Sequence, residues 1–400
     1  MAKYIHLFDT DEEFQAMYND DEKYIEPWAS YTRETDSCGY NKPDPLAKPF
    51  TIEMLENGSM YTYLPYPISY SINGGAWISL NGEDYLDVGL SSGDTVSFKG
   101  NSGISFAESI TGAYNVYGNF MSLVCGDDFA TATTIPQDAY LGNLLANTSV
   151  ISAENLLLPA TTLVPQCYSG MFFRCESLTA APVLPATTLA VSCYYNMFYG
   201  CSSLTTAPAL PATTLAEGCY YEMFAACVSL TTAPTLPATT LAETCYQSMF
   251  AGCSGLTTAP ALPATTLALS CYYEMFSGCE SLTTAPALPA TALTESCYNS
   301  MFNGCTSLTT APVLPATALA ANCYYDMFYG CSYLSSCTIL ATGLTAEDIS
   351  SYAFFMFSLA GEDAASSVLY CANADMVTLF QNNTWDLGLN SGNWTIQVVQ

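Results

Sequence analysis

The chain has 400 residues, half of them hydrophobic, and 36 acidic residues against 7 basic ones give a net charge of −29. Nucleic acid and anionic membranes are excluded as expected partners, because they would be repelled and no basic residue follows Arg174. The 29 tyrosines and 19 phenylalanines exclude a disordered acidic chain. No apolar run is long enough to span a bilayer, and the length predicts two or three modules.

Residues 1–60 differ in composition from the rest and are predicted to form an N-terminal docking segment. Thr10 and Glu13 have the spacing of a capping box before Phe14, which predicts a short helix over residues 11–18. The opening MAKYIHLFDTDEEF has neither the apolar core nor the small-residue cleavage site of a secretory signal. We therefore expect no export by the general secretory route.

This opening resembles an N-terminal module of virion proteins from phages that infect gut Bacteroidales. The resemblance rests on Phe8, Phe14, Tyr24, Glu26, Pro27, Trp28, Tyr31 and Asn41. It implies that the segment docks the chain onto other virion proteins, of the capsid or the tail. The docking residues that it implies are Phe14, Tyr24, Pro27, Trp28 and Tyr31. The alternative is that the segment only caps the fold.

Residues 61–129 are predicted to form a small β-rich spacer domain. The run ISYSINGGAWISL alternates apolar and polar residues around Asn73-Gly74, which predicts a β-hairpin. The run YLDVGLSSGDTVSFKG is predicted to be a second such pair of strands.

Residues 130–340 contain an internal repeat of 26 residues, with residues 130–157 as a degenerate first coil. Each full copy carries one cysteine and a second cysteine eight residues later. The first cysteines are Cys167, Cys193, Cys219, Cys245, Cys271, Cys297 and Cys323. A fixed period over seven copies predicts a solenoid whose coils stack about 4.8 Å apart.

One repeat is predicted to hold a short helix followed by an extended segment. Cys219, Met223 and Cys227 are apolar at positions i, i+4 and i+8, which favours a helix of about two turns. The run LTTAPTLPATTL follows, and its prolines and threonines favour extended chain.

Comparison of the copies separates the predicted core from the predicted surface. Two columns do not vary and are predicted to point inward: Leu184, Leu210, Leu236, Leu262, Leu288 and Leu314, and Phe172, Phe198, Phe224, Phe250, Phe276, Phe302 and Phe328. The positions two and six residues after the first cysteine vary and are predicted to face solvent. Since an aromatic face suits the apolar face of a sugar, their tyrosines are the predicted ligand-binding residues. These are Tyr195, Tyr221, Tyr273, Tyr325, Tyr199 and Tyr329.

Units such as LPATTLAEGCYYEMFAACVSL resemble BspA-like leucine-rich repeats, and residues 158–334 carry the pattern. The resemblance implies a right-handed solenoid and a role in surface adhesion. The predicted fold class is therefore α/β: a leucine-rich-repeat solenoid of 26-residue coils, each with a short strand and a short helix. The chain departs from the commonest form of the family in its longer period and its second cysteine column. Residues 341–400, with Trp385 and Trp394 in short strand-like runs, are predicted to cap the C-terminal end.

Catalytic chemistry is not expected. A Ser-His-Asp or Cys-His site would need the one histidine, His6, which lies at the extreme N-terminus and is expected to be a surface residue. The sequence also contains no nucleotide-binding motif. No cofactor or metal is predicted, although scattered carboxylates leave a glycosidase-type pair as a formal alternative. The cysteines are predicted to be buried thiols that act as small apolar residues, with bridges between neighbouring coils as the alternative.

The function predicted from these features is that of a structural and adhesive phage virion protein: a head fibre or capsid decoration, or a tail fibre. It would be assembled in the host cytoplasm and lie on the exterior of the particle. Its expected partners are other virion proteins through the N-terminus, a host surface protein or glycan, and further copies of itself, with the trimer typical of fibres. The alternatives are a bacterial cell-surface BspA-like adhesin and a glycan-processing enzyme.

Overall fold

The computed structural model describes residues 45–100, 105–107, 109–136, 142–390 and 393–400. The helix predicted at residues 11–18 and the predicted docking residues lie outside this part of the chain; the latter are Phe14, Tyr24, Pro27, Trp28 and Tyr31. Within it, no helix combines the length and the apolar character needed to cross a bilayer.

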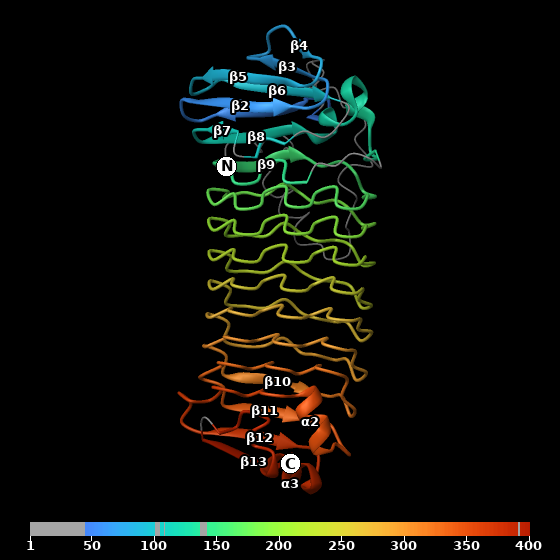
Figure 1. The fold of residues 1–400 in the computed structure, drawn as a ribbon, viewed down its shortest axis with the longest axis vertical. Coiled ribbons are helices and arrows are strands. Elements are labelled where there is room, and N and C mark those ends of the chain that lie inside the picture. Colours follow the sequence, from blue (N-terminus) through green and yellow to red (C-terminus); the bar gives the residue numbers. More distant parts are fainter. Residues whose placement is uncertain (1–44, 101–104, 108, 137–141, 391–392) are drawn as a thin grey trace, which may run out of the picture. The chain divides into compact units, whose positions relative to one another are not determined.

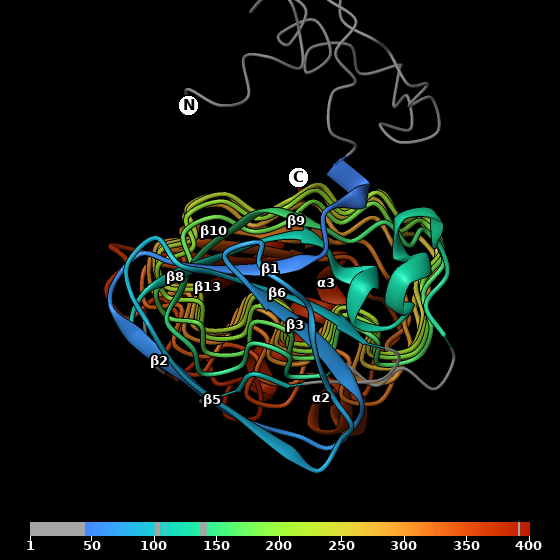
Figure 2. The same cartoon turned by 90° about the horizontal axis from the view of Figure 1, so that it is seen from above.

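Nine strands form two sheets in the N-terminal part of the described chain, and the last of them lies in the degenerate first coil (Figures 1 and 2). They are β1 (Phe50–Met54), β2 (Gly58–Leu64), β3 (Ile68–Ile72), β4 (Ile78–Leu80), β5 (Asp84–Leu90), β6 (Thr95–Gly100), β7 (Ile110–Thr111), β8 (Tyr114–Asn119) and β9 (Val150–Leu157). A six-stranded sheet has the order β4-β3-β6-β1-β8-β9, and a three-stranded sheet has the order β5-β2-β7. The first strand thus begins at Phe50, within the stretch predicted to dock.

One of the two predicted strand pairs is confirmed, and the other is wrong. β3 and β4 pair antiparallel around Asn73 and Gly74, both of which have positive φ as a tight hairpin turn requires. β5 and β6, in contrast, belong to different sheets, since β5 pairs with β2 whereas β6 pairs with β1 and β3. Alternation in the sequence predicts that both segments are strands, but it does not specify their partners.

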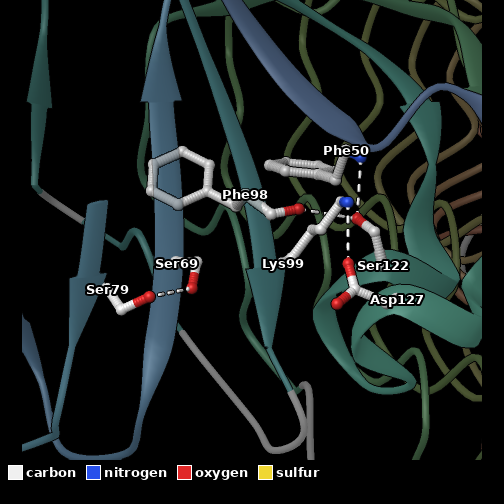
Figure 3. Close-up of polar contacts among 7 residues, drawn as sticks. All are labelled: Phe50, Ser69, Ser79, Phe98, Lys99, Ser122 and Asp127. Carbon is white, nitrogen blue, oxygen red and sulfur yellow. Dashed lines mark hydrogen bonds and ion pairs between the residues drawn. The ribbon is translucent and has the colours of Figure 1, made fainter. Parts of the chain in front are cut away.

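Two 3-10 helices, η2 (Phe120–Leu123) and η3 (Gly126–Thr131), are connected to the six-stranded sheet by hydrogen bonds and an ion pair (Figure 3). The buried Ser122 hydroxyl accepts from the Phe50 backbone N–H and donates to the Phe98 carbonyl, both at 2.8 Å. Lys99 forms an ion pair of 2.8 Å with Asp127 on η3. In the β3–β4 hairpin, the hydroxyls of Ser69 and Ser79 lie 2.9 Å apart. These contacts fix the connection that leads from the sheets toward the repeats.

The repeats contain no α-helix within the described chain, so the predicted short helix is wrong. In its place is a series of hydrogen-bonded turns. Tyr195 N–H donates to the carbonyl three residues back, that of Ser192, at 3.2 Å. The N–H groups on either side, those of Tyr194 and Asn196, donate instead to the next repeat, to the carbonyls of Cys219 and Tyr221 at 3.0 Å each.

A left-handed residue at every fourth position produces this arrangement. In one repeat, φ is +52° at Ser192, +54° at Asn196 and +70° at Gly200, and the same three positions are left-handed in every full copy. The turns closed by Met197 N–H to the Tyr194 carbonyl and by Cys201 N–H to the Phe198 carbonyl have Asn196 and Gly200 as their third residues. Positive φ at the third residue of a four-residue turn is what a type II turn requires. An α-helix cannot contain such residues at this frequency, because each costs about 1–2 kcal/mol for a side chain with a Cβ.

The apolar period agrees with this geometry and not with a helix of 3.6 residues per turn. Over residues 193–201 of one repeat, pairs of buried residues alternate with pairs of half-buried residues. The buried ones are Cys193, Tyr194, Met197, Phe198 and Cys201. A period of four residues therefore places two residues of every turn in the core.

The extended segments of neighbouring repeats meet in isolated parallel bridges between threonines, such as Thr188 with Thr214 and Thr206 with Thr232. Proline cannot donate to a ladder, so longer strands are interrupted here. Longer strands form at the two ends of the repeat region. β9 lies in the degenerate first coil, and β10 (Thr310–Leu314), β11 (Ser336–Ile339), β12 (Ser367–Cys371) and β13 (Trp394–Val398) make a parallel sheet toward the C-terminal end. This region also holds α2 (Ala346–Tyr352) and α3 (Ala374–Asn382). The described chain therefore has a repeat region with short strands and few helices.

Equivalent side chains of successive repeats lie one above another in the core. The rings of the phenylalanine column, from Phe172 to Phe328, follow one another at 5.4 to 5.8 Å and are all buried. The leucine column from Leu184 to Leu314 is buried as well. The inward orientation predicted for both columns is confirmed. Stacking continues beyond residue 341, since Phe357 lies 5.8 Å from Phe328.

Candidate binding surface

The tyrosines predicted to bind ligand lie between the buried pairs of the turns, where they are half-buried or, in the case of Tyr329, exposed. The residue that follows the first of these positions is half-buried in four repeats, but it is buried at Ser248 and Ser300. We call the residues two and three positions after the first cysteine, in the six repeats from Cys193 to Cys323, the tyrosine–acid stripe. Its members are Tyr195, Asn196, Tyr221, Glu222, Gln247, Ser248, Tyr273, Glu274, Asn299, Ser300, Tyr325 and Asp326. The hydrogen bonds between repeats bring these equivalent positions next to one another.

Some aromatic rings of the tyrosine–acid stripe stack on one another. Those of Tyr195 and Tyr221 stack at 5.0 Å with planes 26° apart. Gln247 Nε2 donates to the Tyr221 hydroxyl at 3.3 Å, which extends the contact to a third repeat. Further along, the ring of Tyr325 lies 6.1 Å from that of Phe354. The stripe thus presents an aromatic pair at one end and single tyrosines beyond it.

Acidic groups accompany these tyrosines. Burial, together with the charge of Glu274, raises the pKa of the Glu222 carboxyl. Burial alone raises the pKa of Asp326. Ser248 donates to Glu274 Oε2 at 3.4 Å, and Glu274 in turn contributes to a raised pKa of the Tyr273 hydroxyl, after burial as the main cause. With no basic residue beyond Arg174 in the chain, these carboxylates disfavour an anionic ligand.

Two further predicted residues, Tyr199 and Tyr329, do not join the stripe. They lie four positions later along the turns, and a buried Met-Phe pair separates them from it, Met197 and Phe198 in the case of Tyr199. Tyr199 stacks on Phe173 at 5.1 Å, whereas Tyr329 belongs to a repeat five copies away. The structure therefore brings together four of the six predicted tyrosines in one column and leaves these two apart.

The left-handed column of the stripe was not predicted from the sequence. It holds Asn196, Glu222, Ser248, Glu274, Ser300 and Asp326. Asparagine and aspartate, which are enriched at positive φ, occupy this position in two repeats. A stronger signal is the glycine four residues further on, which recurs as Gly200, Gly252, Gly278, Gly304 and Gly330. The oxygens Asn196 Oδ1 and Asp326 Oδ1 are both shielded from solvent and have no partner in the described chain.

The cysteines carry no bridge in the described residues, where each is a free thiol. The second cysteine of a repeat donates from Sγ to a carbonyl of the preceding repeat, as Cys227 does to Phe198 at 3.1 Å and Cys253 to Phe224 at 3.0 Å. The structure described here contains no group of three or more His, Cys, Asp or Glu side chains placed to hold a metal ion. These thiols therefore act as small buried donors that tie one repeat to the next.

The buried thiols predict loss of stability at alkaline pH. Burial raises the pKa of Cys219 and of Cys253 to about 12, from an ordinary value of 9.0. Between these values the unfolded chain loses protons that the folded chain keeps, so folding stability falls as the pH rises. Each such thiol contributes a slope of about 1.4 kcal/mol per pH unit. Thermal unfolding measured from pH 8 to pH 11 should show the midpoint falling above pH 9, with a shallower fall for Cys253→Ala. A midpoint that stays constant over this range would contradict the burial of the thiols.

A family model described as "BspA type Leucine rich repeat region" matches the chain in six copies, over residues 167–286 and 270–373. The two matches together span just over half of the chain. No curated protein and no solved structure matches it.

Proposed function

The chain belongs to the BspA-type leucine-rich repeat family, and from this premise we propose that it is an adhesive protein whose tyrosine–acid stripe binds uncharged glycans of a host surface or mucus. Repeats of this family suggest a surface-adhesin or protein-binding role, and the family is generally non-enzymatic. We also propose that the stacked repeats form one solenoid, so that the stripe is continuous along it.

The observation that carries the glycan proposal is the stacked pair of Tyr195 and Tyr221 beside half-buried polar groups. Aromatic faces bind the apolar face of a sugar ring, while Gln247 and Glu222 supply the donors and acceptors that its hydroxyls need. A neutral ligand meets no electrostatic penalty from a chain of net charge −29, in contrast to a sulfated or sialylated one.

The glycan proposal is tested by the double substitution Tyr195→Ala/Tyr221→Ala in the full chain, applied to an array of neutral and anionic glycans. We expect binding to neutral glycans to weaken roughly tenfold or more, equivalent to about 1.4 kcal/mol. Tyr333→Ala is the matched control, because Tyr333 is 53% exposed but lies outside the stripe. Unchanged binding in the double variant, or an equal loss in the control, would show that the stripe is not the binding surface.

We further propose that this adhesion takes place on the exterior of a phage particle, where the protein is a head fibre, a capsid decoration or a tail fibre. The support is the resemblance of the opening residues to an N-terminal module of phage virion proteins. That segment would dock on capsid or tail proteins, and the protein would act as a homo-oligomer such as a trimer. The second candidate, a bacterial cell-surface adhesin, is favoured by the family match itself.

Imaging with an antibody against the repeats separates these two candidates. In immunogold electron microscopy, we expect the antibody to label the heads or tails of purified phage particles and not the envelope of uninfected bacterial cells. Label on uninfected cell envelopes, with bare particles, would reject the virion role and leave the adhesin.

A further inference from the structure

Three tyrosines form an exposed cluster on the three-stranded sheet, away from the repeats. Tyr61 and Tyr63 on β2 and Tyr85 on β5 have side chains that are 58%, 47% and 59% exposed. Tyrosines of folded proteins are on average more buried than this. The ring of Tyr85 lies 5.4 Å from that of Tyr61 and 5.2 Å from that of Tyr63. Clustered exposure of this kind marks an interaction surface more often than scattered single residues do.

β5 is the edge strand of this sheet, and no described segment pairs with its outer side. It is seven residues long, which leaves a row of backbone N–H and C=O groups available for another strand. Tyr85, Asp87 and Gly89 alternate on its exposed face, opposite the buried Leu86 and Leu90. A Cβ built on Gly89 would meet nothing within 4 Å, so the face is open at that end.

The charge of this face is negative. Asp87 is exposed and stands directly opposite Tyr61 in the strand register, and the exposed Glu83 precedes Tyr85 in the turn. Lys99, the basic residue of the neighbouring sheet, is already paired with Asp127 and lies over the Trp77 ring at 4.6 Å. A tyrosine cluster beside a carboxylate, on a chain of net charge −29, is complementary to a cationic partner.

We infer that the outer edge of β5 docks an extended, basic segment of a partner protein, which adds to the sheet as a further strand. Alternate side chains of such a strand lie on the same face as Tyr85 and Asp87, because side chains of a strand alternate between faces. Arginine or lysine at those positions would pair with Asp87 and lie against the tyrosine rings. The open space at Gly89 accommodates a long side chain.

The unpaired edge of β5 and the Asp87 carboxylate favour this partner over a glycan. A basic strand would use the backbone groups of that edge and the charge of Asp87, neither of which a neutral sugar requires. This inference is independent of the stripe on the repeats.

The test uses the full chain and a synthetic peptide in which arginine alternates with threonine over seven residues. We expect this peptide to bind, and a peptide of the same composition with its arginines clustered to bind at least tenfold more weakly. N-methylation of alternate backbone amides should abolish binding if the methyl groups face β5, because it removes the edge hydrogen bonds. Asp87→Asn and Tyr61→Ala should each weaken binding about tenfold.

The controls exclude general attraction to an acidic protein. Asp363→Asn and Tyr333→Ala change an exposed acid and an exposed tyrosine elsewhere in the chain and should leave peptide affinity unchanged. Thermal unfolding of each variant confirms that it folds. The inference is overturned if the clustered and alternating peptides bind equally, if the controls lose as much affinity as Asp87→Asn, or if neutral oligosaccharides bind at the tyrosine cluster and the peptide does not.

Discussion

Replacement of Phe250 by alanine should lower the free energy of unfolding by about 3–5 kcal/mol. Phe250 is completely buried in the middle of the phenylalanine column, with its ring 5.7 Å from that of Phe224 and 5.8 Å from that of Phe276. The substitution removes one ring from a continuous stack and leaves a cavity that the rigid repeats on either side cannot close. Chemical denaturation gives the loss, and hydrogen exchange should show it concentrated in the repeats that contact residue 250.

The matched control is Thr235→Ala, which alters an exposed residue of the neighbouring extended segment. It should change the free energy of unfolding by no more than about 0.5 kcal/mol. A loss near zero for Phe250→Ala would mean that the ring is not in the core, and the assignment of inward columns would then be wrong.

Replacement of Gly278 by alanine should destabilise the protein by about 1–2 kcal/mol. Gly278 has a φ of +72°, the left-handed region that a side chain with a Cβ disfavours. An added Cβ would lie 3.5 Å from Cα of Gly252, an ordinary contact, so the cost comes from the backbone conformation. Had this segment been a helix, the same substitution would have stabilised it by about 0.5–1 kcal/mol. The sign of the change in thermal midpoint therefore distinguishes the turns from a helix.

Gly278→Asn is the companion variant, because asparagine tolerates left-handed backbone better than alanine does. It should lose less stability than Gly278→Ala. An increase in stability for the alanine variant would contradict the turn geometry of the repeats.

The core of the repeats could be predicted because it depends on identity between copies. The columns of Phe250 and Leu262 do not vary, and a position that stays apolar through six or seven stacked copies has to be buried. The helix could not be predicted correctly from apolar spacing alone, because positions i, i+4 and i+8 fit both a helix of two turns and three turns of four residues. The residues that decide between them are Asn196, Gly200 and their equivalents, whose backbone conformation is left-handed.

The surface was less predictable than the core. Variation between copies identified the column of Tyr195 and Tyr221, but their stacking and the burial of Glu222 depend on contacts between repeats. The pairing of β5 with β2 was missed for a similar reason, since two strands that follow one another in sequence are not obliged to pair. That pairing is what places Tyr85 beside Tyr61 and creates the exposed cluster.

The central claim is that successive repeats stack in register, so that equivalent residues are separated by equal steps. Val183 and Val313 occupy equivalent positions five repeats apart and are 56% and 54% exposed, so both can carry spin labels introduced as unnatural amino acids. With a step of about 4.8 Å per repeat, electron–electron distance measurements should give a separation of roughly 24 Å, and labels at intermediate repeats should give proportionately shorter ones. Distances that do not increase with the number of repeats between the labels would contradict the stacking and, with it, the binding surface built on it.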